Sequence, residues 1–346
     1  MSYLCGMKTK ILLLALLAIA CAGCKNTRGT TKVSATGSIY ECLVVCPNSM
    51  KGELEAVMGA DMPCLPQMEP YFKVTQIVPN AFDDFLKSTR NILLVDISAD
   101  RYTEAKAKFS KDLWSTPQVV CRLQAPDEAS ALVYWNEHGE TIREWFVRQE
   151  IERQGKFLRA GTNKEARAAL QKTIGVDIWV PEDYMLIKDT TDFVWCCNNK
   201  GPMRRDLVVY KYPYTDKNTF TLEYLCMKRD EVLGPHISAS VEGSHMGTEY
   251  TIFPPIMREL SVQQNGYAAE VRGLWKMLGG EAMGGPFVSH TRVDELHGNI
   301  VTAEVFVYAA GQKKRNALRQ AEAILYTMQL EQEFRQLQEV EVKAEK

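Results

Sequence analysis

Histidine is the side chain best suited to proton transfer and metal binding near neutral pH, and the 346-residue chain contains five of them. Two of them, His290 and His297, lie close together in the sequence, with the carboxylate of Asp294 between them. Zinc accepts imidazole and carboxylate ligands, but this spacing matches no standard zinc signature. We therefore predict no metal site and expect these side chains to be surface polar residues of a β-hairpin.

Residues 279–286 form a glycine-rich segment of the type that can surround phosphate groups. A phosphate-binding loop opens onto the N-terminus of a helix and usually follows a strand. Here the predicted order is the reverse, because a helical pattern precedes the glycines and a strand-like pattern follows them. The segment also lacks the Gly-Lys-Ser/Thr ending. We therefore predict a connector and no bound cofactor.

The connector and its flanks contain the most distinctive candidates of the C-terminal half, namely Arg272, Trp275, Gly284, Gly285 and His290. Apolar side chains recur at helical spacing over residues 267–278, which predicts a helix with Trp275 on its buried face. The two glycines would allow a sharp turn before a strand. We expect a structural helix-to-strand joint in which Trp275 stabilises the core, while His290 can be replaced with little effect on stability.

Short β-rich runs alternate with helical segments in the first half of the chain. The most apolar run, residues 91–97, is bounded by polar residues and is typical of a strand buried on both faces. A long helix is expected after Pro126, with Asp127 as its cap and with Trp135 and Phe146 on its buried side. These patterns predict an N-terminal α/β region over residues 39–160.

From about residue 161 the strand-like runs follow one another with few helices between them, which implies antiparallel pairing. One such run is residues 219–226, and a last helix is expected over residues 314–337. We therefore predict an α+β fold. An alternating β/α half precedes a largely antiparallel half with packed helices, over residues 161–346. Both halves end in a strand and a long helix, which suggests a duplicated α+β unit.

The composition of the chain excludes one class of function. Forty-one basic residues against 43 acidic ones give a net charge of −2, which leaves no electrostatic excess for binding nucleic acid. Seven cysteines lie in the expected globular body: Cys42, Cys46, Cys64, Cys121, Cys196, Cys197 and Cys226. Most are embedded in apolar runs, so we expect buried thiols in preference to disulfides or metal ligands.

The N-terminus has the architecture of a secretory signal peptide. Lys8 and Lys10 precede an apolar run that is too short to span a bilayer. Small residues then lead to Cys24, a pattern that resembles the lipobox of bacterial lipoproteins, in which the cysteine carries diacylglycerol. We predict a signal peptide over residues 1–23, lipidation at Cys24 in preference to Cys21, and a flexible tether over residues 24–38.

Five segments carry a family resemblance: residues 65–70, 90–97, 272–275, 283–290 and 323–325. Together they resemble an uncharacterised family of lipoproteins from Bacteroides-type bacteria, known only as a domain of unknown function. The similarity covers nearly all of residues 39–330. The resemblance implies an envelope lipoprotein and supplies neither an activity nor catalytic residues.

These observations favour a membrane-anchored envelope lipoprotein that acts as a binding or scaffolding module. The expected partners are the membrane, through acyl chains on Cys24, and an envelope protein or glycan. We expect attachment to the outer membrane. Residues 25–28 lack the acidic residues that resemble surface-export signals in such bacteria, which favours a body facing the periplasm over one exposed at the cell surface.

The alternative is an envelope enzyme with a site near Arg272, Trp275, Ser289, His290 and Asp294. A pocket that gathers these five residues would favour the enzyme, and their separation would favour the binding module.

Overall fold

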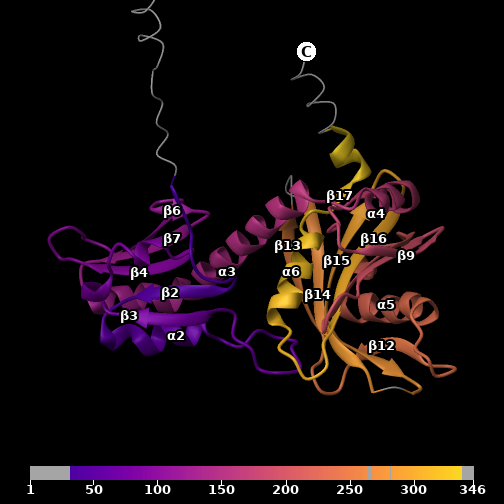
Figure 1. The fold of residues 1–346 in the computed structure, drawn as a ribbon, viewed down its shortest axis with the longest axis horizontal. Helices are drawn as coiled ribbons and strands as arrows, with labels where there is room; N and C mark the ends of the chain where they lie inside the picture. Colours follow the sequence, from indigo (N-terminus) through magenta and orange to yellow (C-terminus); the bar gives the residue numbers. More distant parts are fainter. Residues whose placement is uncertain (1–31, 263–265, 281, 337–346) are drawn as a thin grey trace, which may run out of the picture.

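The computed structural model describes residues 32–262, 266–280 and 282–336. Each half of the chain builds its own β-sheet, and helix α3 (Glu128–Ala160) runs from the first sheet to the second (Figure 1). The expected signal peptide, with Cys21 and Cys24, lies outside the described residues. Within these three ranges, no helix has both the length and the apolar character needed to cross a membrane.

The N-terminal sheet has five strands in the order β3-β2-β4-β7-β5. The first four are parallel, and β5 pairs with β7 in the antiparallel direction. Its strands and their accompanying helix are β2 (Glu41–Val45), α2 (Lys51–Met58), β3 (Lys73–Ile77), β4 (Asn91–Ile97), β5 (Lys106–Lys111) and β7 (Val119–Ala125). The apolar strand β4 lies between β2 and β7, as expected for a strand buried on both faces.

Helix α3 connects the two halves and begins at its predicted cap. The Asp127 carboxylate accepts a hydrogen bond from the Ser130 backbone N–H at 2.7 Å. Trp135 and Phe146 of this helix are buried in the core of the N-terminal domain, as the apolar spacing predicted. The helix has 33 residues, and it also packs against α6 (Arg315–Leu325) of the C-terminal domain.

The flexible tether predicted over residues 24–38 ends earlier in the structure than expected. Strand β1 (Val33–Ser34) pairs in parallel with β6 (Ser115–Thr116), and the Ala35 N–H donates to the Thr116 carbonyl at 2.9 Å. Thr36 forms a further bridge to Thr89. Residues 33–36 therefore belong to the folded body, because their backbone groups are paired with it.

The C-terminal sheet has eight strands, and every pairing in it is antiparallel. The strand order is β12-β14-β15-β16-β11-β10-β9, and β13 lies beside β12 along the same edge of β14. The strands are β9 (Met185–Thr190), β10 (Phe193–Asn198), β11 (Arg204–Pro213), β12 (His245–Glu249), β13 (Ile256–Val262), β14 (Gly266–Leu278), β15 (Gly284–Asp294) and β16 (Asn299–Tyr308). The two sheets differ in strand order and direction, so the halves are not copies of one unit.

Helices cover both faces of the C-terminal sheet. Helix α5 (Leu222–His236) packs on one face, which we call the α5 face. Helix α6, with α4 (Lys164–Ala169) and a π-helical turn at Leu170–Ile174, packs on the other, which we call the α6 face. A small sheet of β8 (Val176–Asp177) and β17 (Gln329–Leu330) lies next to the end of α6. The fold is therefore mixed α+β, as predicted.

Residues 266–278 form strand β14, so the predicted helix over residues 267–278 is wrong. A strand covered by helices on both faces is apolar on both sides and loses the alternation that marks a half-exposed strand. Ala268, Ala269, Val271, Leu274 and Trp275 are all buried, and their order imitates helical spacing.

Two further elements differ from the predictions. Residues 219–226, expected as a strand, lead into α5, where the Thr221 hydroxyl accepts a hydrogen bond from the Tyr224 N–H at 3.3 Å. Tertiary packing of Leu225 and Leu233 on the sheet overrides the strand propensity of Thr, Phe and Tyr in this segment. The last predicted helix ends early, because α6 stops at Leu325 and strand β17 follows.

Candidate functional site

The alternation of side chains along a strand separates the five residues of the enzymatic hypothesis. Arg272 and His290 point to the α6 face, where Arg272 binds Glu322 of α6. Trp275 packs on the α5 face, and Ser289 shares that face with its pairing partner Glu304, which binds Arg229 of α5.

Asp294 is the last residue of β15, and its carboxylate lies 2.7 Å from Nδ1 of His297. The five residues therefore line no common pocket.

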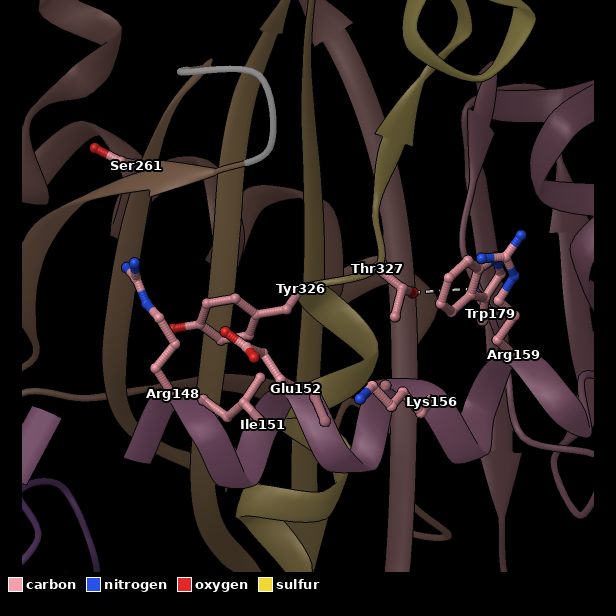
Figure 2. A pocket seen from close by; sticks show the side chains of 11 residues that line it. Arg148, Ile151, Glu152, Lys156, Arg159, Trp179, Ser261, Tyr326 and Thr327 are labelled. Atoms are coloured by element: carbon pink, nitrogen blue, oxygen red, sulfur yellow. Dashed lines mark hydrogen bonds between the residues drawn. The ribbon is translucent and has the colours of Figure 1, made fainter. Parts of the chain in front are cut away.

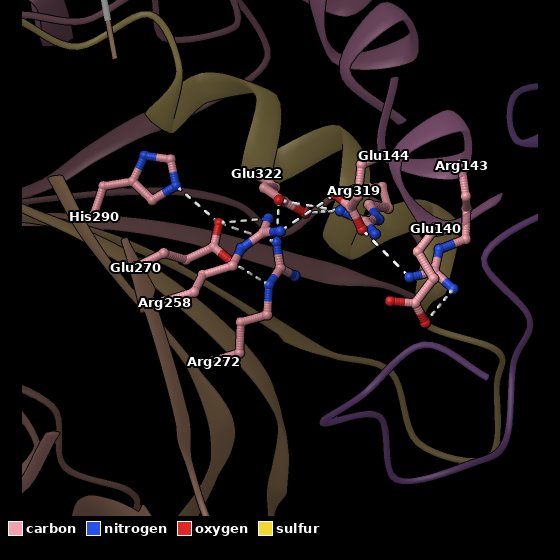
Figure 3. A network of polar contacts seen from close by, with 9 residues as sticks. All are labelled: Glu140, Arg143, Glu144, Arg258, Glu270, Arg272, His290, Arg319 and Glu322. Atoms are coloured by element: carbon pink, nitrogen blue, oxygen red, sulfur yellow. Dashed lines mark hydrogen bonds and ion pairs between the residues drawn. The ribbon is translucent and has the colours of Figure 1, made fainter. Parts of the chain in front are cut away.

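The α6 face carries a buried group of charges that was not predicted from the sequence. This ionic cluster consists of Arg258, Glu270, Arg272, His290, Arg319 and Glu322 (Figure 3). Glu270 lies at its centre and accepts hydrogen bonds from Nε of Arg258 and from Nε of Arg272, each at 2.6 Å. Its second oxygen is 3.3 Å from Nε2 of His290.

Helix α6 contributes the other half of the ionic cluster. The Glu322 carboxylate binds Arg272, and it also accepts hydrogen bonds from Arg319 at 2.9 and 3.1 Å. The Arg319 guanidinium lies over the rings of Tyr40 and Tyr71, which belong to the N-terminal domain. The cluster therefore sits where the two domains meet.

The arginines keep both carboxylates of the ionic cluster ionised in spite of their burial. Burial raises the pKa of Glu270, but the charges of Arg272 and Arg258 and the hydrogen bond to His290 outweigh it. The pKa of Glu270 is therefore held well below its usual value. Burial likewise raises the pKa of Glu322, and the charges of Arg272 and Arg319 more than offset it, so this pKa is also lowered.

Ion pairs extend the cluster to helix α3. Arg258, which is half-buried, binds Glu144 at 3.3 Å as well as Glu270. Arg143 lies 3.6 Å from Glu144, and its guanidinium stacks over Tyr71 at 4.3 Å. A chain of charges thus joins the C-terminal sheet to α3 (Figure 3).

His290 is fully buried, so the expectation of a surface polar residue is wrong. Its side chain lies between Glu270 and the ring of Tyr326, whose centroid is 4.8 Å away. Asp294 is also buried, and only His297 of the predicted group is substantially exposed. Because His290 is one of the partners of the buried Glu270 carboxylate, we expect its replacement to disturb the cluster and lower stability.

The α5 face has a second buried ion pair. Arg229 of α5 binds both oxygens of Glu304 at 2.7 to 3.0 Å, and its other nitrogen donates to the Thr248 hydroxyl at 3.0 Å. Its guanidinium lies 4.0 Å above the ring of Phe287. Each face of the sheet is thus fastened to its covering helix by a buried Arg–Glu contact.

The predicted joint is a β-hairpin between β14 and β15. Gly284 and Gly285 lie inside β15, and the glycine with left-handed backbone is Gly279, at φ +80°. Gly285 is required for close approach, because a Cβ there would lie 2.0 Å from the Val307 carbonyl oxygen. The same oxygen accepts a hydrogen bond from the buried Trp275 indole at 3.2 Å. Trp275 is therefore a core residue, as expected.

A concave feature lies between α3 and the C-terminal domain, and we call it the interdomain groove (Figure 2). Its main cavity has a volume of about 490 Å³. It is lined by Arg148, Ile151, Glu152, Gly155, Lys156 and Arg159 of α3, and by Trp179, Ser261, Ala323, Tyr326 and Thr327. A cavity of about 260 Å³ continues it toward Arg258 and shares Arg148, Ile151 and Tyr326.

The groove adjoins the ionic cluster. Tyr326, which contacts His290, forms part of its floor, and Arg258 lines its smaller cavity. The backbone N–H of Trp179 donates to the Thr327 hydroxyl at 3.0 Å, which attaches the Trp179 segment to the end of α6. No sequence pattern indicates this groove, because its walls come from segments far apart in the chain.

Cysteine and metal chemistry receive no support from the geometry of the described residues. All seven body cysteines are free and buried, as expected from their apolar surroundings. Burial raises the pKa of the Cys121 thiol to about 12 and that of Cys226 to about 11, so both are protonated at neutral pH. Across the described ranges, no three His, Cys, Asp or Glu side chains are grouped so that they could hold a metal ion.

Comparison with known proteins divides the chain at the end of α3. Residues 35–159 match the domain of unknown function DUF8532, and residues 163–327 match the domain of unknown function DUF4837. These matches confirm the expected relation to uncharacterised domains, while the lipoprotein aspect stays a prediction. No curated protein matches the sequence.

Solved structures show only distant likeness. The Ran-binding protein Mog1p of Saccharomyces cerevisiae is 9% identical over 45% of this chain and 90% of its own, with a TM-score of 0.29. CyanoP from Synechocystis sp. PCC 6803 is 6% identical over 49% of this chain and 89% of its own, with a TM-score of 0.30. Similarities at this level carry no functional argument.

Proposed function

We propose that this protein, whose two halves each match a domain family of unknown function, is a lipid-anchored binding module of the cell envelope. The observation that carries the proposal is the interdomain groove, together with the separation of the enzymatic candidates between the two faces of the sheet. A concave surface between two domains is a common place for a ligand. The catalytic alternative needs Arg272, Ser289 and His290 on one side of the sheet.

The anchor is proposed from the sequence around Cys24 and the polar residues that follow it. Cleavage before Cys24 would leave a short segment, and the body begins where β1 pairs with β6. The chain has a small net negative charge, so attachment would rest on acyl chains and not on attraction to anionic lipid. We propose the outer membrane as the site of attachment, with the body facing the periplasm.

We expect Cys24→Ser to abolish incorporation of a fatty-acid analogue, because the hydroxyl cannot replace the thiol that carries the lipid. The measurement is metabolic labelling of the full-length protein, followed by gel detection. Cys21→Ser is the matched control, since it removes a thiol three residues away and should leave labelling unchanged. Full labelling of Cys24→Ser, or its loss in Cys21→Ser alone, would contradict the assignment.

The binding role is tested at the interdomain groove. Arg148→Gln combined with Lys156→Gln removes two exposed cations of the groove without touching the buried core. We expect the purified full-length protein to retain a component of a detergent extract of envelopes, and the double variant to retain much less of it. Lys172→Gln with Lys217→Gln is the matched control, because both lysines are exposed and lie outside the groove. Equal retention by all three proteins would refute a binding role for this groove.

A further inference from the structure

A row of cations lies along the side of α3 that faces the interdomain groove. Arg148, Lys156 and Arg159 all line its main cavity, with Glu152 between the first two (Figure 2). At 1.5 Å of rise per residue, the row from Arg148 to Arg159 spans about 16 Å. Its length fits an elongated ligand with charges spaced along it better than a single small ion.

The charges of the groove favour an anion. Glu152 is the one acid among the residues that line the main cavity, and it binds Lys111 outside the groove at 2.9 Å. Neither Arg148 nor Lys156 has a carboxylate at ion-pair distance within the described part of the chain, and both are exposed. Cationic charge therefore accumulates in this groove, although the whole chain has a net charge of −2.

Aromatic rings form much of the wall opposite α3. The rings of Trp179 and Tyr326 are half-buried, and the Arg159 guanidinium lies over Trp179 at 5.5 Å. The hydroxyl-bearing residues Ser261 and Thr327 also line the cavity. The groove thus combines flat apolar surfaces with polar groups and a line of cations.

We propose that the interdomain groove binds an acidic oligosaccharide through the cations of α3 and the ring of Trp179. This inference rests on the proposed binding function and names its ligand class. Sugar carboxylates would pair with Arg148 and Lys156, and the C–H face of a sugar ring would pack on the indole. An extended acidic peptide fits less well, because the backbone groups of α3 are already paired within the helix and offer it no main-chain partners.

The test is calorimetric titration of the full-length protein in detergent with tetragalacturonate. Maltotetraose serves as the neutral sugar, and tetraglutamate as the acidic peptide. We expect binding of tetragalacturonate alone, weakening as salt is added. Arg148→Gln with Lys156→Gln should lower the affinity roughly tenfold or more, since each removes a charge-assisted hydrogen bond. Trp179→Leu should also weaken binding, whereas Lys172→Gln with Lys217→Gln should not.

Three results would overturn the inference. Tetraglutamate binding as tightly as the sugar, without dependence on Trp179, would assign the groove to acidic peptides and leave the binding function standing. Equal affinity for maltotetraose would remove the role of the cations. Absence of tetragalacturonate binding, in a protein that still retains envelope material through Arg148 and Lys156, would reject the ligand class alone. Thermal unfolding of each variant confirms that it is folded.

Discussion

Arg272→Met is expected to lower the free energy of unfolding by about 3–5 kcal/mol, the usual cost of removing one partner of a buried ion pair. Arg272 is 5% exposed and binds both Glu270 and Glu322, which are each 0% exposed. Its loss leaves two carboxylates in the core with fewer cations beside them. Urea denaturation at neutral pH measures the effect.

The matched control is Arg148→Met, which removes an exposed arginine without an ion-pair partner among the described residues. It should change stability by less than about 0.5 kcal/mol. A second comparison is the double variant Glu270→Leu with Arg272→Met. Its cost should be smaller than the sum of the two single costs, because the two residues contact each other. Equal stability of Arg272→Met and wild type would contradict the buried cluster.

Arg272→Met should also change how stability depends on pH. The pKa values of Glu270 and Glu322 are lowered in the folded protein, so the unfolded chain binds protons first as the solution is acidified. Their contribution to stability is present above the unfolded pKa, near 4.5, and is lost as pH falls toward the folded values. In Arg272→Met the folded pKa values should rise, so stability should fall less steeply on acidification.

Elements with local signals were predictable from the sequence. The cap of α3 needs only Asp127 and the residues that follow it, and the apolar spacing of Trp135 and Phe146 reflects one helix surface. The β-hairpin around His290, Asp294 and His297 was also predicted, and it lies between β15 and β16, with Gly298 in its turn at φ +64°. In each case the deciding residues are neighbours in the chain.

The ionic cluster could not be predicted, because its partners come from β13, β14, β15 and α6. Nothing near Glu270 in the sequence indicates that Glu322 and Arg319 will lie beside Arg272. One signal was present, since Glu270 and Arg272 interrupt an apolar run, and charges in such a buried segment are tolerated only when they are paired. Glu270 and Arg272 alternate with Ala269 and Val271, which is typical of a strand, but the apolar residues Ala268 and Leu274 on the same face as the charges obscure this alternation.

Trp275→Ala is expected to lower the free energy of unfolding by about 3–5 kcal/mol, as for other large aromatic truncations in cores. The side chain is 3% exposed, and its ring packs against Phe306 at 5.6 Å between centroids. Guanidinium denaturation measures the loss. Trp275→Phe helps to separate the two contributions, because it keeps most of the apolar contact and removes the hydrogen bond to Val307, which is worth about 1 kcal/mol.

Variants of Gly285 test which factor contributes more to the stability of this part of the core, the packing of Trp275 or the close approach of the strands. A Cβ on Gly285 would meet the Val307 carbonyl oxygen and would lie 3.2 Å from Nε1 of Trp275. Gly285→Ala alone should cost about 1–3 kcal/mol through overpacking, whereas Gly52→Ala, on an open helical surface, should cost nothing.

Combining Gly285→Ala with Trp275→Ala should cost less than the sum of the single effects, because the cavity left by the indole admits the strand shift that the methyl group requires. Full additivity would mean that the Val307 backbone alone opposes the methyl group. Trp275 would then act only by filling volume, and not by fixing how closely β15 and β16 approach.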